Sequence, residues 1–102
     1  MKVELKPNEV VVKAGDTNHL LENEKVKGKL ILTNQRLYFK SLNLDMTKSN
    51  FELLPADISE VMVFNVFSLT GNGLSLITRD GRELKFMIKK RDDWCRMING
   101  MN

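Results

Sequence analysis

The segment GKLILTNQRLYFKS, Gly28–Ser41, carries the clearest structural signal in the chain. Two short apolar runs, Leu30–Leu32 and Leu37–Phe39, flank the polar residues Thr33–Arg36. Apolar runs of this length around a polar turn are typical of paired strands, and asparagine suits a tight turn. The segment therefore predicts a β-hairpin. We expect its strands at Lys25–Thr33 and Arg36–Ser41.

Side chains alternate between the two faces of a strand, which assigns the two faces of this hairpin. If the larger apolar residues point inward, the outer face is basic. The inward set is then Leu30, Leu32, Leu37 and Phe39. The outward set is Lys27, Lys29, Arg36, Tyr38 and Lys40. This basic face is either a surface that attracts anionic lipid or an acidic partner, or a face that stays in water and discourages pairing with other chains.

Strand signals continue through most of the remaining sequence, where runs rich in valine, isoleucine and phenylalanine are separated by turn residues. Asp80–Gly81 is the strongest turn signal and predicts a type I′ hairpin. Thr70–Gly73 predicts another turn, and Ala14–Asn18 predicts a bulge or a wide bend in the first strand. The further strands are expected at Glu9–Leu21, Phe51–Leu54, Ile58–Phe67, Leu74–Arg79 and Arg82–Ile88.

The hydrophobic period changes from Arg91 onward, which indicates a helix. The apolar residues at helical spacing are Trp94, Met97, Ile98 and Met101. Gly100 suits the end of this helix, and Trp94 is expected to anchor it because an aromatic ring buries a large area. The sequence therefore predicts a mainly β fold of about seven strands with one C-terminal helix, in a single domain over residues 1–102.

Several stretches resemble the GRAM domain family. Gly28–Ser41 is similar to its run of glycine, apolar strand, Thr-Asn turn, Arg-Leu, Phe and Ser. Phe51–Ile58 resembles its apolar-Pro-x-Asp-Ile step, and Leu74–Phe86 resembles its Thr-x-Asp-Gly hairpin. Trp94 is similar to the tryptophan of pleckstrin-homology helices. The resemblance implies a pleckstrin-homology-like split barrel of two antiparallel sheets capped by the C-terminal helix.

The resemblance also implies a role in binding membrane lipids or proteins, without catalysis, and this chain looks most like the small bacterial members. Lipid sites of pleckstrin-homology domains lie around the loop that joins the first two strands and carry lysine and arginine. The matching loop here carries Glu22 and Glu24, which repel phosphate.

Composition limits the compartment and the partners. The net charge is +3, which attracts anionic partners only weakly. The single cysteine, Cys95, forms no internal disulfide and favours a reducing compartment. The sequence begins without a secretory signal pattern, and its apolar runs are shorter than the roughly 20 residues that cross a bilayer. We expect a cytoplasmic protein, or one at the inner face of the membrane.

The residues suggest no catalytic, metal or cofactor site. His19 is expected to point to solvent or to make one hydrogen bond, and Cys95 to be a buried, unreactive thiol. Tyr38 is the clearest outward aromatic residue, which disfavours nucleic-acid binding because such sheets stack bases on several aromatic rings. The basic run Lys89–Arg91 at the last strand–helix junction either binds anionic lipid or nucleic acid or is simply solvated, and the acidic pair Asp92–Asp93 that follows favours the solvated interpretation.

The strand expected at Ile58–Phe67 is apolar on both faces. Val61 and Val63 are expected in the core, which leaves a second apolar set pointing outward. That set is Met62, Phe64 and Val66. It is either a surface for a protein partner or a second copy, or it is covered by the loop Leu42–Asn50 or by the N-terminal residues. Protein binding or self-association is the predicted function, and membrane association through the basic face is the alternative.

Overall fold

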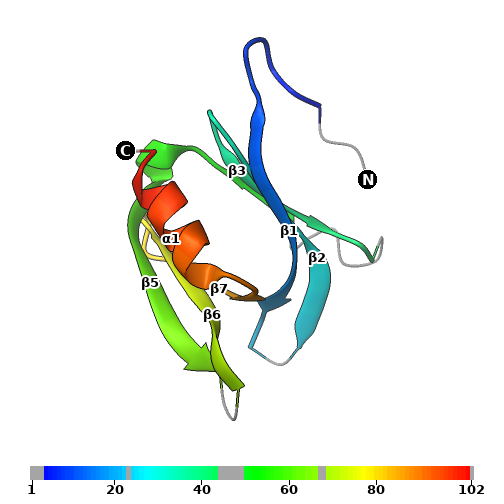
Figure 1. Cartoon of the computed structure of the whole chain (residues 1–102), viewed down its shortest axis with the longest axis vertical. Helices are drawn as coiled ribbons and strands as arrows, with labels where there is room; N and C mark the ends of the chain where they lie inside the picture. Colours follow the sequence, from blue (N-terminus) through cyan, green and yellow to red (C-terminus); the bar gives the residue numbers. More distant parts are fainter. Residues whose placement is uncertain (1–3, 23, 44–49, 67–68, 102) are drawn as a thin grey trace.

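The computed structural model describes residues 4–22, 24–43, 50–66 and 69–101, with the side chains of residues 66 and 69–71 also outside the description. Strands account for most of this length, and the one α-helix of the described chain is its last element (Figure 1). The elements are β1 (Val11–Leu20), β2 (Lys25–Thr33), β3 (Leu37–Ser41), β4 (Phe51–Leu53), the short 3-10 helix η2 (Pro55–Asp57), β5 (Ile58–Val66), β6 (Leu69–Thr78), β7 (Glu83–Ile88) and α1 (Arg91–Asn99).

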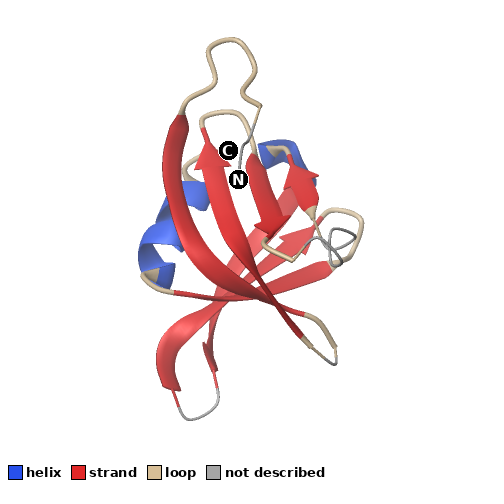
Figure 2. Ribbon diagram, turned by 90° about the vertical axis from the view of Figure 1, so that its right-hand side faces the viewer, coloured by secondary structure: helices blue, strands red, loops and turns tan. Residues whose placement is uncertain are grey.

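The seven strands form one antiparallel sheet in the order β4-β3-β2-β1-β7-β6-β5. Strand β1 joins its two halves, because β1 pairs with β2 along its length but with β7 only over Thr17–Leu20. The sheet curls strongly on itself (Figure 2). The predicted fold class is confirmed, and the two expected sheets are the two halves of this one curled sheet.

The core lies inside the curl. Leu30, Leu32, Leu37 and Phe39 are almost fully buried, so the inward face predicted for the hairpin is confirmed. They share one cluster with apolar residues of the other half of the sheet and of the helix. These include Leu74, Leu76, Phe86, Ile88, Trp94 and Ile98.

Helix α1 lies across the open side of the curl, between β1 and β5 (Figure 1). Trp94 and Ile98 are its buried residues, which confirms Trp94 as the anchor. The indole lies against Gly15 of β1, where an added Cβ atom would be 3.3 Å from the ring. Gly100 is the C-cap, as expected, but it has ordinary right-handed backbone angles.

Two local predictions were wrong, and the bulge that was one alternative for Ala14–Asn18 lies elsewhere in β1. The register of β1 against β2 is regular through Ala14–Asn18, and the irregularity lies between Val11 and Lys13. Thr70–Gly73 belongs to β6, where Gly73 is needed because the Phe64 ring would lie 2.6 Å from a Cβ atom. At Asp80–Gly81 only Gly81 has a positive φ, so the turn lacks the two left-handed residues of type I′.

Gly28→Ala tests the close approach of β2 to β3. The new Cβ would collide with the Lys40 carbonyl oxygen and lie 2.7 Å from the Phe39 ring. We expect a loss of about 2 kcal/mol or more, because overpacking forces the backbone to move. This corresponds to a fall in melting temperature of roughly 8 °C or more. Gly100→Ala is the control, since its Cβ meets ordinary contacts and the variant should be neutral or slightly stabilised in thermal denaturation.

Candidate functional site

The basic face predicted on β2 and β3 is only partly present. Lys27 is exposed, and Lys29 and Lys40 are partly exposed. Arg36 and Tyr38 are buried, with 7% and 4% of their surface exposed, so their placement in a solvent-facing patch was wrong. Their side chains point outward from the sheet, but other residues cover them.

The cover is Glu9, which lies just before β1 and is itself buried. Its carboxylate accepts hydrogen bonds from Arg36 at Nε and Nη2, both at 2.7 Å, and from Thr33 Oγ1 at 2.6 Å. Arg36 also pairs with Glu52, and its guanidinium lies 4.3 Å from the centre of the Tyr38 ring. Arg36 is therefore fully engaged inside the protein.

This cluster sets the protonation of Glu9. Hydrogen bonds from Arg36 hold the pKa of Glu9 at about 2, well below its ordinary value of 4.5. Burial alone would raise this pKa, and the hydrogen bonds from Arg36, Thr33 and the Lys6 amide outweigh it. Glu9 is consequently ionised at any physiological pH.

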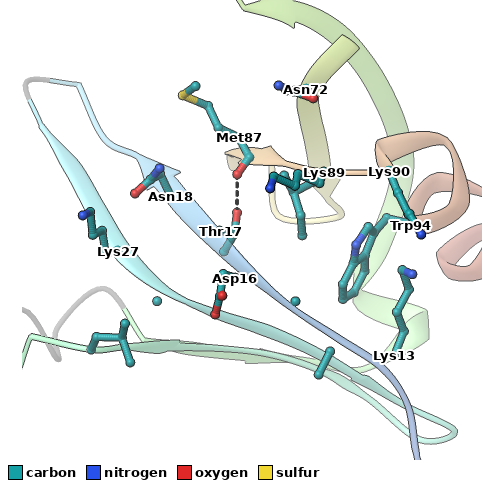
Figure 3. A pocket seen from close by; sticks show the side chains of 15 residues that line it. Lys13, Asp16, Thr17, Asn18, Lys27, Asn72, Met87, Lys89, Lys90 and Trp94 are labelled. Atoms are coloured by element: carbon teal, nitrogen blue, oxygen red, sulfur yellow. Dashed lines mark hydrogen bonds between the residues drawn. The ribbon is translucent and has the colours of Figure 1, made fainter.

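A different basic site lies where β1 separates from β7. A groove of about 740 Å³ is lined there by Lys13, Lys27, Lys89 and Lys90, with Trp94 at one end. Figure 3 shows Lys27 and Asn18 on the β1–β2 side and Asn72 and Met87 across from them. Thr17 Oγ1 donates to the Met87 carbonyl at 2.8 Å and fixes the two sides.

Charge in this groove is predominantly positive. Asp16 is the one acidic residue among the described residues that line it. Its carboxylate lies 3.5 Å from Lys29 Nζ, outside the lining set. Of the predicted basic residues only Lys27 belongs to the groove. Sequence reasoning missed Lys13 and ranked lipid binding by Lys89 and Lys90 below a solvated role, because the convergence of these lysines depends on where β1 leaves β7.

The predicted apolar surface lies on β5, which forms one edge of the sheet. Met62 is 41% exposed, as expected, and Phe64 is half-buried over Gly73. Val61 packs against the core, but Val63 is 43% exposed, so its expected burial was wrong. The side chain of Val66 lies outside the described residues, as does most of the loop proposed to cover this strand.

The family model for the GRAM domain matches residues 1–100. This chain belongs to the GRAM domain family. Solved structures support the fold. A C-terminal domain of a Leishmania infantum protein has a TM-score of 0.78 at 14% identity, over 93% of this chain and 85% of that one. The Vps36 N-terminal PH domain has a TM-score of 0.69 at 16% identity, over 96% of this chain and 85% of that one.

The N-terminal PH domain of human ARAP2 is also similar, with a TM-score of 0.68 at 19% identity over 87% of this chain and 76% of that one. A search of the curated proteins gave no match. GRAM and PH-like domains are generally non-catalytic modules that bind proteins or lipids. This chain is therefore a domain of a type known for binding proteins or lipids.

His19 is a core residue of this GRAM domain: of its two expected placements, pointing to solvent or making one hydrogen bond, the first is wrong and the second is present. It is 4% exposed, its ring stacks on Phe86 at 4.7 Å, and Nδ1 lies 3.0 Å from the Lys85 carbonyl oxygen. Burial lowers the pKa of His19. Cys95 is half-buried rather than buried.

The described residues show neither a metal-binding cluster nor a membrane-spanning helix. They contain no group of three or more His, Cys, Asp or Glu arranged to hold a metal ion. Helix α1, at nine residues, falls far short of the roughly 20 that a membrane-spanning helix needs, and no helix in this part of the chain qualifies.

Glu9→Gln tests the buried cluster. Breaking one side of a buried ion pair leaves the buried Arg36 paired with the half-exposed Glu52 alone, and we expect a loss of about 3 kcal/mol in urea denaturation at pH 7. The pKa of Glu9 is lower in the folded protein than in the unfolded chain. The stability that it contributes is therefore fully present above about pH 4.5 and is lost as the pH falls toward 2.

The measurement is the difference in unfolding free energy between the two proteins from pH 7 to pH 2. This difference should shrink on acidification below about pH 4.5. The contribution of His19 is common to both proteins and cancels. A difference that is constant with pH would contradict an ionised, buried Glu9.

Proposed function

We propose that this GRAM domain binds protein by adding an extended strand at the edge of β5, and that a second copy of the chain is one such partner. The observation that supports this most directly is the contrast between the two edges of the sheet. Strand β4 has three residues and is followed by Pro55, whereas β5 has nine. Short strands and proline are the usual protection against pairing with another chain.

Strand β5 has little such protection. Glu60 is the only charged residue in Ile58–Val66, and the strand contains no lysine or proline. Arg91 donates to the carbonyl of Phe64, near one end. The middle exposes Met62 and Val63 on opposite faces, so a partner strand would gain apolar contacts on both sides in addition to main-chain hydrogen bonds.

Val63→Lys tests this edge. Two copies pairing through β5 would bring the new charges together, so we expect self-association to weaken at least about tenfold. Sedimentation velocity across a range of concentrations should show the wild-type average mass rising and the variant remaining monomeric. Leu21→Lys is the matched control, because it places the same charge at an exposed apolar residue away from β5. A wild-type protein that stays monomeric up to millimolar concentration would contradict self-association.

A second function is supported by the lysine groove, and it is attachment to an anionic membrane surface. Lysines from β1, from β2 and from the β7–α1 junction converge there, with Asp16 as the opposing charge in the lining. Each lysine near an anionic surface contributes about 1 kcal/mol to the binding free energy. Salt at 0.1 M largely screens this attraction at separations beyond about 10 Å. This site replaces the basic face expected on β2 and β3, from which Arg36 and Tyr38 are withdrawn.

Vesicle co-sedimentation tests this second function. Vesicles of phosphatidylcholine with phosphatidylserine should bind the wild-type protein at low salt, and pure phosphatidylcholine should not. Lys89→Gln should weaken binding about fivefold, since one attraction of about 1 kcal/mol is lost. Lys25→Gln is the control, because Lys25 is exposed on β2 but does not line the groove. An equal effect of both variants would indicate general surface charge and would exclude the groove as the site.

A further inference from the structure

The N-terminal segment Glu4–Val10 lies along the turn Thr33–Arg36, far from it in the sequence. All of its residues except Glu9 are exposed. The segment therefore buries one side chain and otherwise rests on the surface. This arrangement has the form of a bound peptide: an exposed chain with a single inserted anchor.

The turn recognises the backbone of this segment. Asn34 donates from Nδ2 to the Asn8 carbonyl at 3.0 Å, and its Oδ1 accepts from the Val10 amide at 2.9 Å. The Asn34 amide donates to the Val10 carbonyl at 3.1 Å, and Gln35 Nε2 donates to the Pro7 carbonyl at 3.1 Å. These contacts require no particular side chain, so another peptide of the same backbone shape can make them.

The turn recognises one side chain, and it is a carboxylate. Arg36 holds Glu9 with two nitrogens, Thr33 donates from Oγ1, and the Tyr38 hydroxyl lies at 3.4 and 3.5 Å from the two carboxylate oxygens. A planar guanidinium that binds a carboxylate through two hydrogen bonds is a common basis of selectivity for acidic side chains. The site is thus a receptor for a glutamate that follows a turn in the peptide, here the turn at Pro7–Asn8 that the Glu9 amide closes by donating to the Lys6 carbonyl.

We infer that the turn Thr33–Arg36 is a binding site for a glutamate-bearing peptide segment of a partner protein, and that Glu4–Val10 occupies this site until the partner displaces it. Segments with few buried contacts open locally at lower free energy than the whole domain. The inference is independent of β5 and of the lysine groove, because it uses none of their residues.

Competition explains how such a site is regulated. A tethered segment acts at an effective concentration of about millimolar, so a free peptide meets an occupied site and binds weakly. Removing the tethered anchor should reveal the intrinsic affinity. Glu9→Ala does this while leaving Thr33, Asn34, Gln35 and Arg36 intact.

The experiment uses a fluorescein-labelled peptide with the sequence of residues 4–12, ELKPNEVVV, in anisotropy titrations against the full chain. Glu9→Ala should bind it saturably, at least about tenfold more tightly than the wild-type chain does. The same peptide with glutamine in place of the glutamate at position 9 should bind the variant at least about tenfold more weakly. Glu24→Ala is the control, since this exposed glutamate lies outside the segment, and it should behave as the wild type.

Two results would overturn the inference: a folded Glu9→Ala chain that does not bind the peptide, or one that binds the glutamate and glutamine peptides equally. If Glu9→Ala does not fold, hydrogen exchange of the wild-type chain decides. The amides of Lys6 and Val10, which donate to Glu9 and Asn34, should exchange at least about a hundredfold faster than the slowest amides of β2. Equal protection would show that the segment opens only with the whole domain.

Discussion

Contact between Trp94 and Gly15 determines how this sheet closes. Strand β1 pairs with β2 throughout but with β7 only from Thr17 to Leu20, so the two halves of the sheet diverge on the N-terminal side of Thr17. The indole of α1 fills the opening, and Gly15 lets β1 lie close to it, because a Cβ atom there would be only 3.3 Å from the ring. The side chains of helix α1 therefore fill the gap between the two halves of the sheet. As a result, the hydrophobic core is continuous across both halves.

Both candidate ligand surfaces follow from this incomplete closure. Because β4 and β5 do not pair with each other, each remains an edge, and only β4 is short and followed by proline. The lysine groove lies at the divergence itself, where residues of β1 and β2 face the β7–α1 junction (Figure 3). A sheet closed by its own strands would have neither feature, since its edges would be paired and its corner filled.

Sequence periodicity predicted the fold well because the core depends on local alternation. Leu30 and Phe39 had to point inward for the hairpin to bury anything, and both do. Outward direction was correctly assigned for Arg36 and Tyr38, but direction does not determine exposure. Their cover comes from Glu9, which is distant in the sequence, and alternation along one hairpin carries no information about it.

Gly73 shows a second limit of prediction from the sequence. Gly73 was interpreted as a turn residue, yet it lies within β6. Glycine is needed at this position because the Phe64 ring occupies the space that a side chain would fill. Turn formation and close approach both require glycine, and a single sequence does not separate them.

Charge in this domain has to be judged residue by residue, because net charge does not distinguish a paired cation from a free one. Arg36, inside the segment that first suggested a basic surface, is neutralised by Glu9 and Glu52. Lys89 and Lys90, for which the sequence favoured a solvated role over lipid binding, face a groove whose described lining holds one carboxylate, that of Asp16. The turn Thr33–Arg36 thus has two roles. It connects the strands of the hairpin, and it binds Glu9 in a manner that another acidic peptide can reproduce. That second role depends on Asn34 and Gln35, which bind backbone carbonyls and not side chains. A different peptide with the same backbone shape can therefore make the same hydrogen bonds.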